Sequence, residues 1–591
     1  MASIKLFTFN ELYSIEGLKK IDNKFLSVVK EKNLKLYEKL ITLRKTPSTY
    51  SAKNDFSFFK DLNPIFEDFI SEIFPIKNQL KQHKSKANNF KFVYICKRNF
   101  IQKRIINKLD DYSHNDSEID DFIKKNGLNH SYNLEKLFKK IGKQLSSNKL
   151  NDKFIKTCES FFKWVLINKN EYFDHNHDLF HFPQKNQDVD KKIIRDQNNS
   201  NTLKYSKIKN RYDFSLNSNE VSNNHLLNNT NYCLFCHDRD KDSCSKGFLK
   251  NNLKGCPLDQ KISEFQYFAN EGSILSALAI ICIDNPMVAA TGNRICNDCS
   301  KSCIFQNQEP VDIPSVESKT LVNVLDLTFG FEIYSLLTKW NPFKFNNYLP
   351  RTSTGKKILI SGLGPSGFTS AHYLLQAGHL VVAIDGLKIE KIENKIIGDA
   401  LVDSVDFRPI KNTRFLYEDL DTRVPIGFGG VAEYGITVRW NKNFLKIIQI
   451  ILQRHKNFLL LDGVKLESNL TIKDAINEEK FDHICLAHGA GKPNIPSIDN
   501  NLIKGVKTAS DFLMNLQLSG AYNLNSLSNL FIRMPIAVIG GGLTAIDTAT
   551  ESKQYYFRML EIVGMKLDKL KKNNKLVSYK KRLNLKNKVV F

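Results

Sequence analysis

The residues most able to do chemistry are the cysteines, eight of which fall between Cys233 and Cys303. Thiolates separated by two residues can bind one metal centre, and a Cys-Pro pair closing such a run is typical of ferredoxin-like ligation. In a chain without an export signal, clustered cysteines favour metal or iron–sulfur ligation over disulfides. We therefore predict iron–sulfur ligands, with two zinc sites as the alternative. The two groups read Cys233-x2-Cys236-x7-Cys244-x11-Cys256-Pro257 and Cys296-x2-Cys299-x3-Cys303, whereas Cys282 lies in an apolar helical run and is expected in the core.

A glycine-rich turn further along the chain carries the second chemical signal. A buried-strand pattern over 357–361 leads into the turn, a helix pattern follows over 368–377, and a second strand over 379–384 ends at an aspartate. Glycines let the backbone approach a pyrophosphate at the helix N-terminus, and the acid can accept a hydrogen bond from a ribose hydroxyl. The arrangement predicts a dinucleotide site at Gly362, Gly364, Gly367 and Asp385.

A similar turn follows Ile536–Ile539, which we expect to form another strand. The third glycine of the pattern is replaced by alanine. We interpret the turn as a second nucleotide site, with a structural turn that binds no ligand as the alternative. Its predicted contacts are Gly540, Gly542, Ala545 and Asp547.

The cysteine segment, from Cys233 to Glu317, resembles the N-terminal two-cluster domain of the glutamate synthase small subunit and of dihydropyrimidine dehydrogenase. The two cysteine groups, Asn285-Pro286 between them and the run over 310–317 after them carry the resemblance. It implies two [4Fe–4S] clusters with crossed ligation. The spacing between the cysteines of the first group is wider than in the family. Because a longer loop costs little closure entropy, the cluster can still form. One cluster would use Cys233, Cys236, Cys244 and Cys303, and the other would use Cys256, Cys296, Cys299 and Glu317.

The same family, which belongs to the pyridine nucleotide-disulfide oxidoreductase superfamily, supplies further matches. The resemblance implies FAD at the first turn, NADPH at the second and a chain of electron transfer from NADPH through FAD to the clusters. Only Cys485 remains after Cys303, which excludes the cysteine pair that a disulfide reductase needs beside its flavin. The loop along the flavin would contain Gly429, Gly430 and Gly435, and the turn closing the FAD site would contain Ala487 and Gly489.

Several domains must position the cysteines and the glycine turns, because 591 residues exceed the usual size of a single domain. We predict a multidomain chain in which a helical N-terminal region and a helical two-cluster domain precede an α/β, Rossmann-like FAD domain and a partial NAD(P) domain. The predicted boundaries are 1–183 for the N-terminal region, 184–230 for a polar linker, 231–345 for the clusters, 346–530 for FAD and 531–591 for a truncated NAD(P) segment with a basic tail.

The net charge of +24 comes from 86 basic and 62 acidic residues spread along the whole chain. We attribute this charge to a compositional bias toward lysine and asparagine rather than to a nucleic-acid surface. No apolar run approaches the roughly 20 residues of a membrane span, and the N-terminus shows no signal peptide. These observations predict a cytoplasmic protein without a membrane span.

The predicted function is that of an oxidoreductase that passes electrons from NAD(P)H through FAD and two clusters to a protein acceptor or completing subunit. The nicotinamide domain is short relative to the family, since 49 residues (591 − 542) follow Gly542. A non-catalytic remnant that binds clusters or serves as an interaction scaffold is the alternative.

Overall fold

A computed structural model gives the fold, and its residues group into two compact units that are described separately. Unit 1 comprises Met1–Lys207, Val221–Arg351 and Pro409–Arg414; unit 2 comprises Ile208–Glu220, Thr352–Arg408 and Phe415–Phe591. The residues described are 4–47, 52–106, 116–128, 131–147, 152–167, 177–183, 193–195, 203–205, 220–239, 242–248, 254–292, 296–398, 407–420, 423, 426–434, 441–490, 493–501, 503–528 and 530–572.

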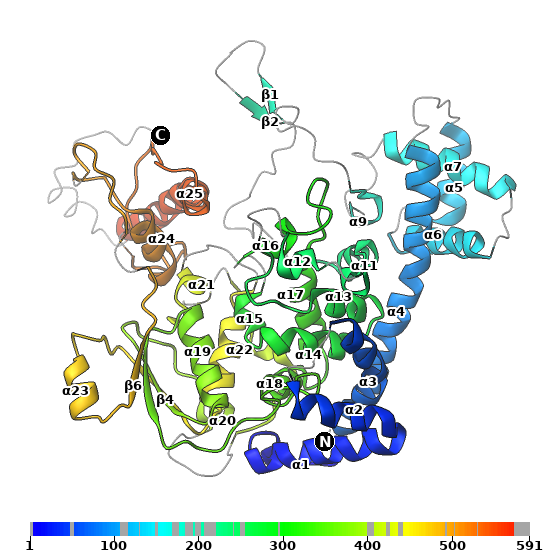
Figure 1. Cartoon of the computed structure of the whole chain (residues 1–591). Coiled ribbons are helices and arrows are strands. Elements are labelled where there is room, and N and C mark those ends of the chain that lie inside the picture. Colours follow the sequence, from blue (N-terminus) through cyan, green and yellow to red (C-terminus); the bar gives the residue numbers. More distant parts are fainter. Residues whose placement is uncertain are drawn as a thin grey trace. The chain divides into compact units, whose positions relative to one another are not determined.

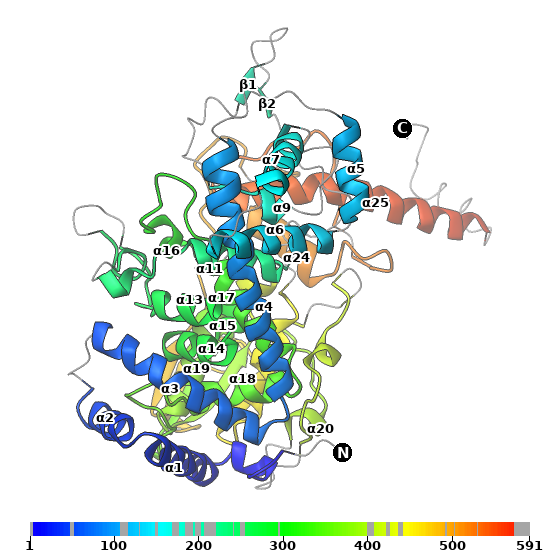
Figure 2. The ribbon, with the colours of Figure 1, turned by 90° about the vertical axis from the view of Figure 1, so that its right-hand side faces the viewer.

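The first helices of unit 1 form because apolar residues recur three and four positions apart. In α1 (Ile15–Lys32), Leu18, Ile21, Phe25 and Val29 are buried on one face. The helix begins at Ser14, whose hydroxyl accepts a hydrogen bond from the backbone N–H of Gly17. This face packs against α2 (Leu34–Lys45) and α3 (Ala52–Ile73), as Figures 1 and 2 show in dark blue. The predicted helical N-terminal region is therefore confirmed.

A second group of helices follows in unit 1 and packs around aromatic side chains. Helix α4 (Lys77–Ile95) continues into η3 (Cys96–Ile105), a stretch of π-helix, and both contact α6 (Ser131–Ser146). Insertions of π-helix are rare and occur frequently at functional sites. The rings of Phe100 and Phe138 each pack edge-on against that of Phe162.

The cysteine-bearing part of unit 1 is built around α14 (Ile274–Asp284), whose residues 274–283 are all buried. A helix that is apolar on every side belongs inside the protein. It packs against α13 (Ile262–Asn270), α17 (Ile313–Leu325) and α18 (Gly330–Lys339), and Cys282 lies in this core as expected. The remaining elements of unit 1 are η1 (Phe9–Leu12), α5 (Asp116–Asn126), α7 (Asp152–Ile167), α9 (His177–Phe180), β1 (Ile193–Arg195), β2 (Leu203–Tyr205), α11 (Asn223–Tyr232), η6 (Cys236–Arg239), α12 (Ser243–Lys246), α15 (Val288–Thr291) and α16 (Asp298–Lys301).

Unit 2 contains a four-stranded parallel sheet in the order β5-β4-β3-β6, the arrangement predicted for an α/β domain. One face packs against α19 and α22, and the other carries a core of six buried apolar residues. Parallel strands align their carboxyl ends, so the residues that follow β3, β4 and β6 meet at one edge. The bounds are β3 (Lys357–Ser361), α19 (Pro365–Gln376), β4 (Leu380–Asp385), α20 (Asn394–Ile397), α21 (Val431–Tyr434), α22 (Phe444–Gln453), β5 (Phe458–Asp462), α23 (Ile472–Asn477) and β6 (His483–Leu486). The short helix η7 (Thr413–Leu416) begins in unit 1 and ends in unit 2.

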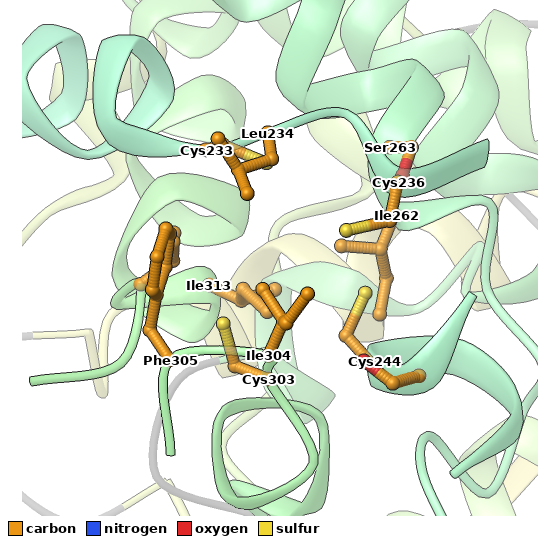
Figure 3. Close-up of a pocket in the computed structure, with 12 residues that line it drawn as sticks. Cys233, Leu234, Cys236, Cys244, Ile262, Ser263, Cys303, Ile304, Phe305 and Ile313 are labelled. Carbon is orange, nitrogen blue, oxygen red and sulfur yellow. The ribbon is translucent and has the colours of Figure 1, made fainter. Parts of the chain in front are cut away.

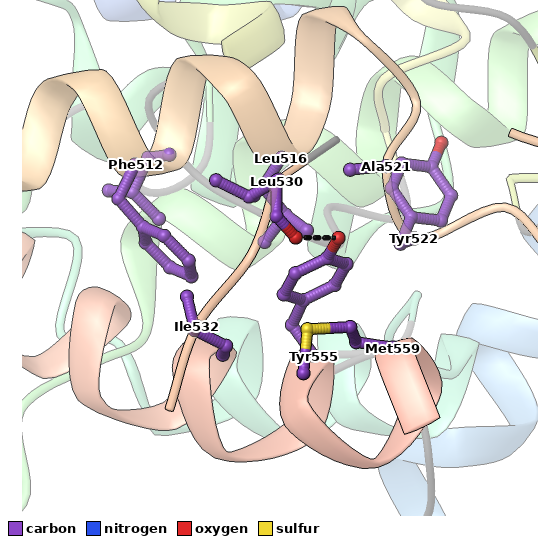
Figure 4. Packing of buried hydrophobic residues seen from close by; sticks show 9 residues of the cluster. Phe512, Leu516, Ala521, Tyr522, Leu530, Ile532, Tyr555 and Met559 are labelled. Carbon is purple, nitrogen blue, oxygen red and sulfur yellow. Dashed lines mark hydrogen bonds between the residues drawn. The ribbon is translucent and has the colours of Figure 1, made fainter. Parts of the chain in front are cut away.

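The C-terminal part of unit 2 is a small cluster formed by two helices and the segment between them. Helices α24 (Ala509–Leu518) and α25 (Leu543–Lys572) pack around Phe512, Leu516 and Ile532. The Tyr555 hydroxyl donates a 2.6 Å hydrogen bond to the carbonyl of Leu530 (Figure 4).

The prediction of a strand at Ile536–Ile539 is wrong, because these residues do not form a strand and Ile539 is 77% exposed. A lone strand leaves its backbone N–H and C=O groups without partners, and no neighbouring strand pairs with it in the described part of the chain. The helix after the glycine turn does form, as α25.

Among the described residues, no single helix is both long and apolar enough to cross a membrane. The consecutive helices α17 and α18 reach that length and composition only when taken together, across a bend of 119°.

Candidate functional site

Four of the predicted cysteine ligands surround one cavity of unit 1, of about 320 Å³ including its open part. Figure 3 shows the sulfur atoms of Cys236, Cys244 and Cys303 directed into the space between them. Cys233 is the residue that ends α11, and its N–H donates to the carbonyl of Asn229 over 3.0 Å. The other three lie at the start of η6, within α12 and just after α16. The lining thus combines three cysteines of the first sequence group with the last cysteine of the second.

The thiols of this cavity are shielded from water. Burial raises the pKa of Cys233 to about 12 and raises that of Cys244 well above its usual range, with smaller contributions from the neighbouring cysteines and, for Cys244, from Asp242. A buried thiolate therefore needs positive charge at this position, and metal binding would release the thiol protons.

The remaining predicted ligands form a second group around Glu317. The pKa of Cys299 is raised by burial first and then by the charges of Glu317 and Cys256, which places these residues close together. The carboxylate of Glu317 is buried, and its Oε1 accepts from Gln260 Nε2 at 2.8 Å and from Asn285 Nδ2 at 3.1 Å. The fourth member of this group, Cys296, is exposed.

A backbone contact connects the two groups. The N–H of Cys256 donates to the carbonyl of Cys244 over 3.0 Å. Gly255, with φ of +74°, makes this approach possible, because a Cβ there would lie 2.3 Å from the carbonyl oxygen of Ser245.

Within the part of the chain that the structure describes, no three His, Cys, Asp or Glu side chains converge closely enough to hold one metal ion. Four ligands of a single zinc ion must meet at one point, about 2.3 Å from it for sulfur. In a four-iron cluster each cysteine binds a different iron, so its sulfurs surround a larger volume.

His237, directly after Cys236, is a buried residue that the sequence patterns did not single out. Its Nδ1 hydrogen-bonds to Glu264 of α13, and its Nε2 lies 2.5 Å from Asp242 Oδ2. Burial lowers the pKa of His237, but the bonds to Asp242 and Glu264 outweigh this effect and raise it to about 9. The protonated ring therefore ties the turn that carries the cysteines to the helical core.

At the sheet edge of unit 2, the structure brings together the predicted residues of the first glycine turn. Gly362 has φ of +99°, and a Cβ on it would lie 2.4 Å from the carbonyl oxygen of Ala487. A Cβ on Gly367 would lie 1.8 Å from the carbonyl oxygen of Gly362. Only glycine fits at these two positions, and α19 begins inside the turn, at Pro365.

Asp385, at the end of β4, faces the same turn. Its Oδ2 accepts from the N–H of Leu363 over 2.9 Å, and its Oδ1 accepts from the N–H of Leu387 over 3.0 Å. These bonds fix the carboxylate at the edge where the predicted ribose would lie.

The loop predicted to run along a flavin also reaches this turn. A Cβ on Gly430, which has φ of +51°, would lie 2.9 Å from the Cα of Gly364, and the N–H of Gly429 donates to the carbonyl of Leu363 over 3.1 Å. Gly489 follows the Ala487 turn with φ of +72° and open space around it. The predicted contact Gly435 lies outside the described residues.

Two side chains near this edge form pairs that the sequence analysis did not identify. His488 Nε2 lies 2.6 Å from the Ser361 hydroxyl at the end of β3. Glu433 stands where the resembling family often carries a basic residue, and it forms a buried ion pair of 2.9 Å with Arg423. Neither pair was visible from the sequence, because the partners lie far apart along the chain or on an irregular loop.

The second glycine turn is open. Gly540 has φ of +130°, and a Cβ on Gly542 would meet no atom within 4 Å. The other two predicted contacts, Ala545 and Asp547, lie in the first turns of α25.

Two family models match the sequence. The model described as the RP005 N-terminal alpha-helical domain matches residues 5–75. The uncharacterized protein RP005 of Rickettsia prowazekii (strain Madrid E) is 30% identical over 291 residues, which are 44% of this chain and 95% of that protein. The chain belongs to the RP005 family.

The second model, described as pyridine nucleotide-disulphide oxidoreductase, matches residues 356–566 of this RP005-family chain. The glutamate synthase [NADPH] small chain of Bacillus subtilis (strain 168) is 28% identical over 330 residues, which are 54% of this chain and 55% of that protein. Residues 356–566 thus match a pyridine nucleotide-disulphide oxidoreductase domain, and the chain is similar to the glutamate synthase small chain, which confirms the predicted resemblance.

Another protein of Rickettsia prowazekii (strain Madrid E), the uncharacterized protein RP006, is 52% identical over 275 residues. That match covers 46% of the RP005-family chain and 37% of RP006. The chain therefore spans little more than a third of RP006 and about half of the Bacillus small chain.

Proposed function

We propose that this oxidoreductase takes electrons from NADPH onto FAD and delivers them through two [4Fe–4S] clusters to an acceptor. The observation that carries the proposal is the cavity in which Cys303, from the second sequence group, joins Cys233, Cys236 and Cys244 of the first. When bound, FAD would accept a hydride and release single electrons, and the clusters would carry these electrons onward.

The first cluster would be held by the four cysteines of the cavity in Figure 3. The donor set supports this assignment, because four thiols line a small, mostly apolar space and offer one sulfur to each iron. Cys244 is on a wider loop than the family has, yet it lines the cavity with the other three.

The second cluster would use Cys256, Cys296 and Cys299, with Glu317 as its fourth ligand. Glu317 is held by two amide donors from Gln260 and Asn285. Such supporting hydrogen bonds orient a carboxylate ligand and tune the centre that it binds. The exposed Cys296 would place this cluster near the surface of unit 1.

FAD would lie along the carboxyl edge of the sheet, with its pyrophosphate at the Gly362–Gly367 turn. The absence of side chains at Gly364 and Gly430 lets two backbone segments approach each other and leaves room for a phosphate group beside them. Asp385 would accept from the ribose, and Gly429 and Gly489 would flank the rest of the flavin nucleotide.

NADPH would bind at the turn formed by Gly540, Gly542, Ala545 and Asp547. The N-terminus of the long helix α25 favours a phosphate there, since its first backbone N–H groups lack intrahelical partners. The electron acceptor would be a protein partner.

A second candidate function is that of a cluster-binding scaffold without reductase activity. The open second turn favours it, because Ile539 is exposed and no strand precedes the glycines in the described residues. In that case the chain would bind the clusters, but NADPH would reduce neither a flavin nor the clusters.

One anaerobic preparation of the full chain tests both candidates. Iron, sulfide and flavin are quantified, and the visible spectrum is recorded during titration with NADPH. The reductase predicts about eight iron atoms and one flavin per chain, and bleaching of the flavin band by NADPH. Iron and sulfide without a response to NADPH support the scaffold, whereas a colourless protein that contains zinc contradicts both.

A further inference from the structure

A second cavity lies in unit 1, on the side of α11 that bears Tyr232. It measures about 850 Å³ including its open part. Its walls come from the end of α4, from η3, from residues 181–183, from α11 and from the loop 309–312. None of the residues that line it is a cluster ligand or a nucleotide contact proposed above.

The cavity wall carries two cationic side chains on the π-helical turn. Lys97 is buried, and its Nζ donates to Asn228 Oδ1 over 2.9 Å. Arg98 is more exposed, and its Nη1 donates to Gln102 over 2.8 Å. Burying an ammonium group costs free energy, so a buried lysine on a cavity wall favours an anionic ligand.

The two acidic side chains on the wall each face an imidazole. His181 Nε2 lies 2.5 Å from Glu309 Oε1, and His225 Nε2 lies 3.2 Å from Asp312 Oδ2. Burial raises the pKa of Asp312, but the hydrogen bonds to His225 and Ser315 lower it by more. The net effect is a lowered pKa, so the carboxylate remains charged. Each of the two acids on the wall is therefore already held by an imidazole.

Flat apolar surfaces make up the rest of the wall. The rings of Tyr94, Phe182 and Tyr232 line the space together with two prolines. Aromatic and proline surfaces of this kind favour a planar ring in the ligand.

The cavity also adjoins the four-cysteine cavity. Tyr232 lines the second cavity and Phe305 lines the four-cysteine cavity. Their rings stack with centroids 4.3 Å apart. A ligand in the second cavity would thus be separated from the cysteine cavity by one aromatic pair.

From these observations the structure assigns a binding site for a small planar organic anion, such as an aromatic carboxylate, to this cavity of unit 1. The carboxylate pairs with Lys97 and Arg98, and the ring lies between Tyr94, Phe182 and Tyr232. This site goes beyond the proposed function, and binding there does not depend on the presence of iron or flavin.

Calorimetric titration of the full chain with benzoate, and with its neutral analogue benzamide, tests the assignment. Benzoate is expected to bind more tightly than benzamide. Lys97→Met, which keeps the apolar stem, is expected to weaken benzoate binding about tenfold, the loss of one charge-assisted hydrogen bond. Lys103→Met on the exposed side of the same helix is the matched control and should bind benzoate like the natural chain.

Three results would overturn the site: no benzoate binding, equal binding of benzoate and benzamide, or the same affinity in Lys97→Met as in Lys103→Met. If Lys97→Met fails to fold by circular dichroism, Arg98→Gln at the more exposed position replaces it, and unchanged benzoate affinity there overturns the site. Iron and flavin are quantified in the same samples. A preparation without them that still binds benzoate in a Lys97-dependent manner refutes the proposed function and leaves this site standing.

Discussion

The ring of Tyr232 stacks on that of Phe305 at a centroid distance of 4.3 Å and an interplanar angle of 17°. Tyr232 directly precedes Cys233, and Phe305 follows Cys303 by two positions. The stack therefore holds together the two chain segments that complete the four-cysteine cavity, and it forms part of the wall between that cavity and its neighbour.

Replacement of the Tyr232 ring tests whether the stack on Phe305 holds the cysteine cavity together. Tyr232→Leu removes the stacking on Phe305 and is expected to lower the free energy of unfolding by about 1–2 kcal/mol, from lost ring contact and buried area. Iron should also be lost faster when the purified protein is exposed to air, which absorbance near the cluster band measures. Tyr232→Phe, which keeps the ring and loses the hydroxyl bond to the Glu309 carbonyl, should retain its iron longer. Equal loss rates in the two variants would contradict this role.

Cysteine replacements distinguish the ligands from the buried cysteines. Cys303→Ser is expected to reduce the iron content by about half, because one of two clusters loses a thiolate ligand. Cys282→Ser alters an equally buried cysteine of α14 and should keep its full iron content if it folds. Iron and sulfide assays on anaerobic samples report both outcomes. Full iron in Cys303→Ser would remove this residue from the ligand set.

The first glycine turn can be tested by adding one methyl group. In Gly367→Ala the Cβ would lie 1.8 Å from the carbonyl oxygen of Gly362, and backbone atoms cannot move aside as a side chain can. We expect loss of bound flavin and a destabilisation of about 1–3 kcal/mol. Gly564→Ala lies in α25 with no atom within 4 Å of the added Cβ, and it should gain up to about 1 kcal/mol of helix stability. Flavin absorbance and thermal unfolding measure the difference between them.

A buried ion pair stabilises the N-terminal helices of unit 1. Asp22 accepts from Arg44 Nη1 at 2.8 Å and Nη2 at 3.0 Å, and from Trp340 Nε1 at 2.8 Å. Asp22→Ala leaves a buried guanidinium without its acid, and it should cost about 3–5 kcal/mol of unfolding free energy. Asp68→Ala breaks an exposed pair with Lys32 and should cost under about 1 kcal/mol. Urea denaturation followed by tryptophan fluorescence compares the two variants, and similar midpoints would refute this account.

Acid should weaken unit 1 through His83. Burial, with a smaller effect from the charge of Lys86, lowers its pKa from 6.5 to about 4. Because the unfolded chain binds a proton below pH 6.5 and the folded chain resists it until about pH 4, stability is lost as the pH falls through this window. The loss is about 1–3 kcal/mol for this half-buried group. His83→Gln should remove that part of the pH dependence, and parallel stability curves for the two proteins between pH 6.5 and 4 would contradict it.

Several parts of the fold and site could be predicted because local spacing encodes them. The apolar positions of α1 and α3 specified helices, and the strand-turn-helix pattern around Gly362 specified a nucleotide-type turn. The strand expected at Ile536–Ile539 failed for a physical reason. A short apolar run becomes a strand only where neighbours satisfy its backbone, and that condition is not local.

The contacts that join distant segments or lie on irregular loops could not be predicted in the same way. His488 beside Ser361, Arg423 beside Glu433 and His237 between two carboxylates follow no spacing rule. The second cavity is of this kind as well, since its wall combines residues from the helical N-terminal region with the loop after the cysteines.

The sequence by itself determined the kinds of groups available: the clustered thiols, the glycine turns and the amphipathic helices, since each depends on residues that are near one another along the chain. The tertiary structure decided which thiols share a cavity, which glycines touch another backbone segment and where a lysine is buried beside aromatic rings. Those relationships depend on packing between segments far apart in sequence, where burial and close contact, rather than local spacing, set the free energy.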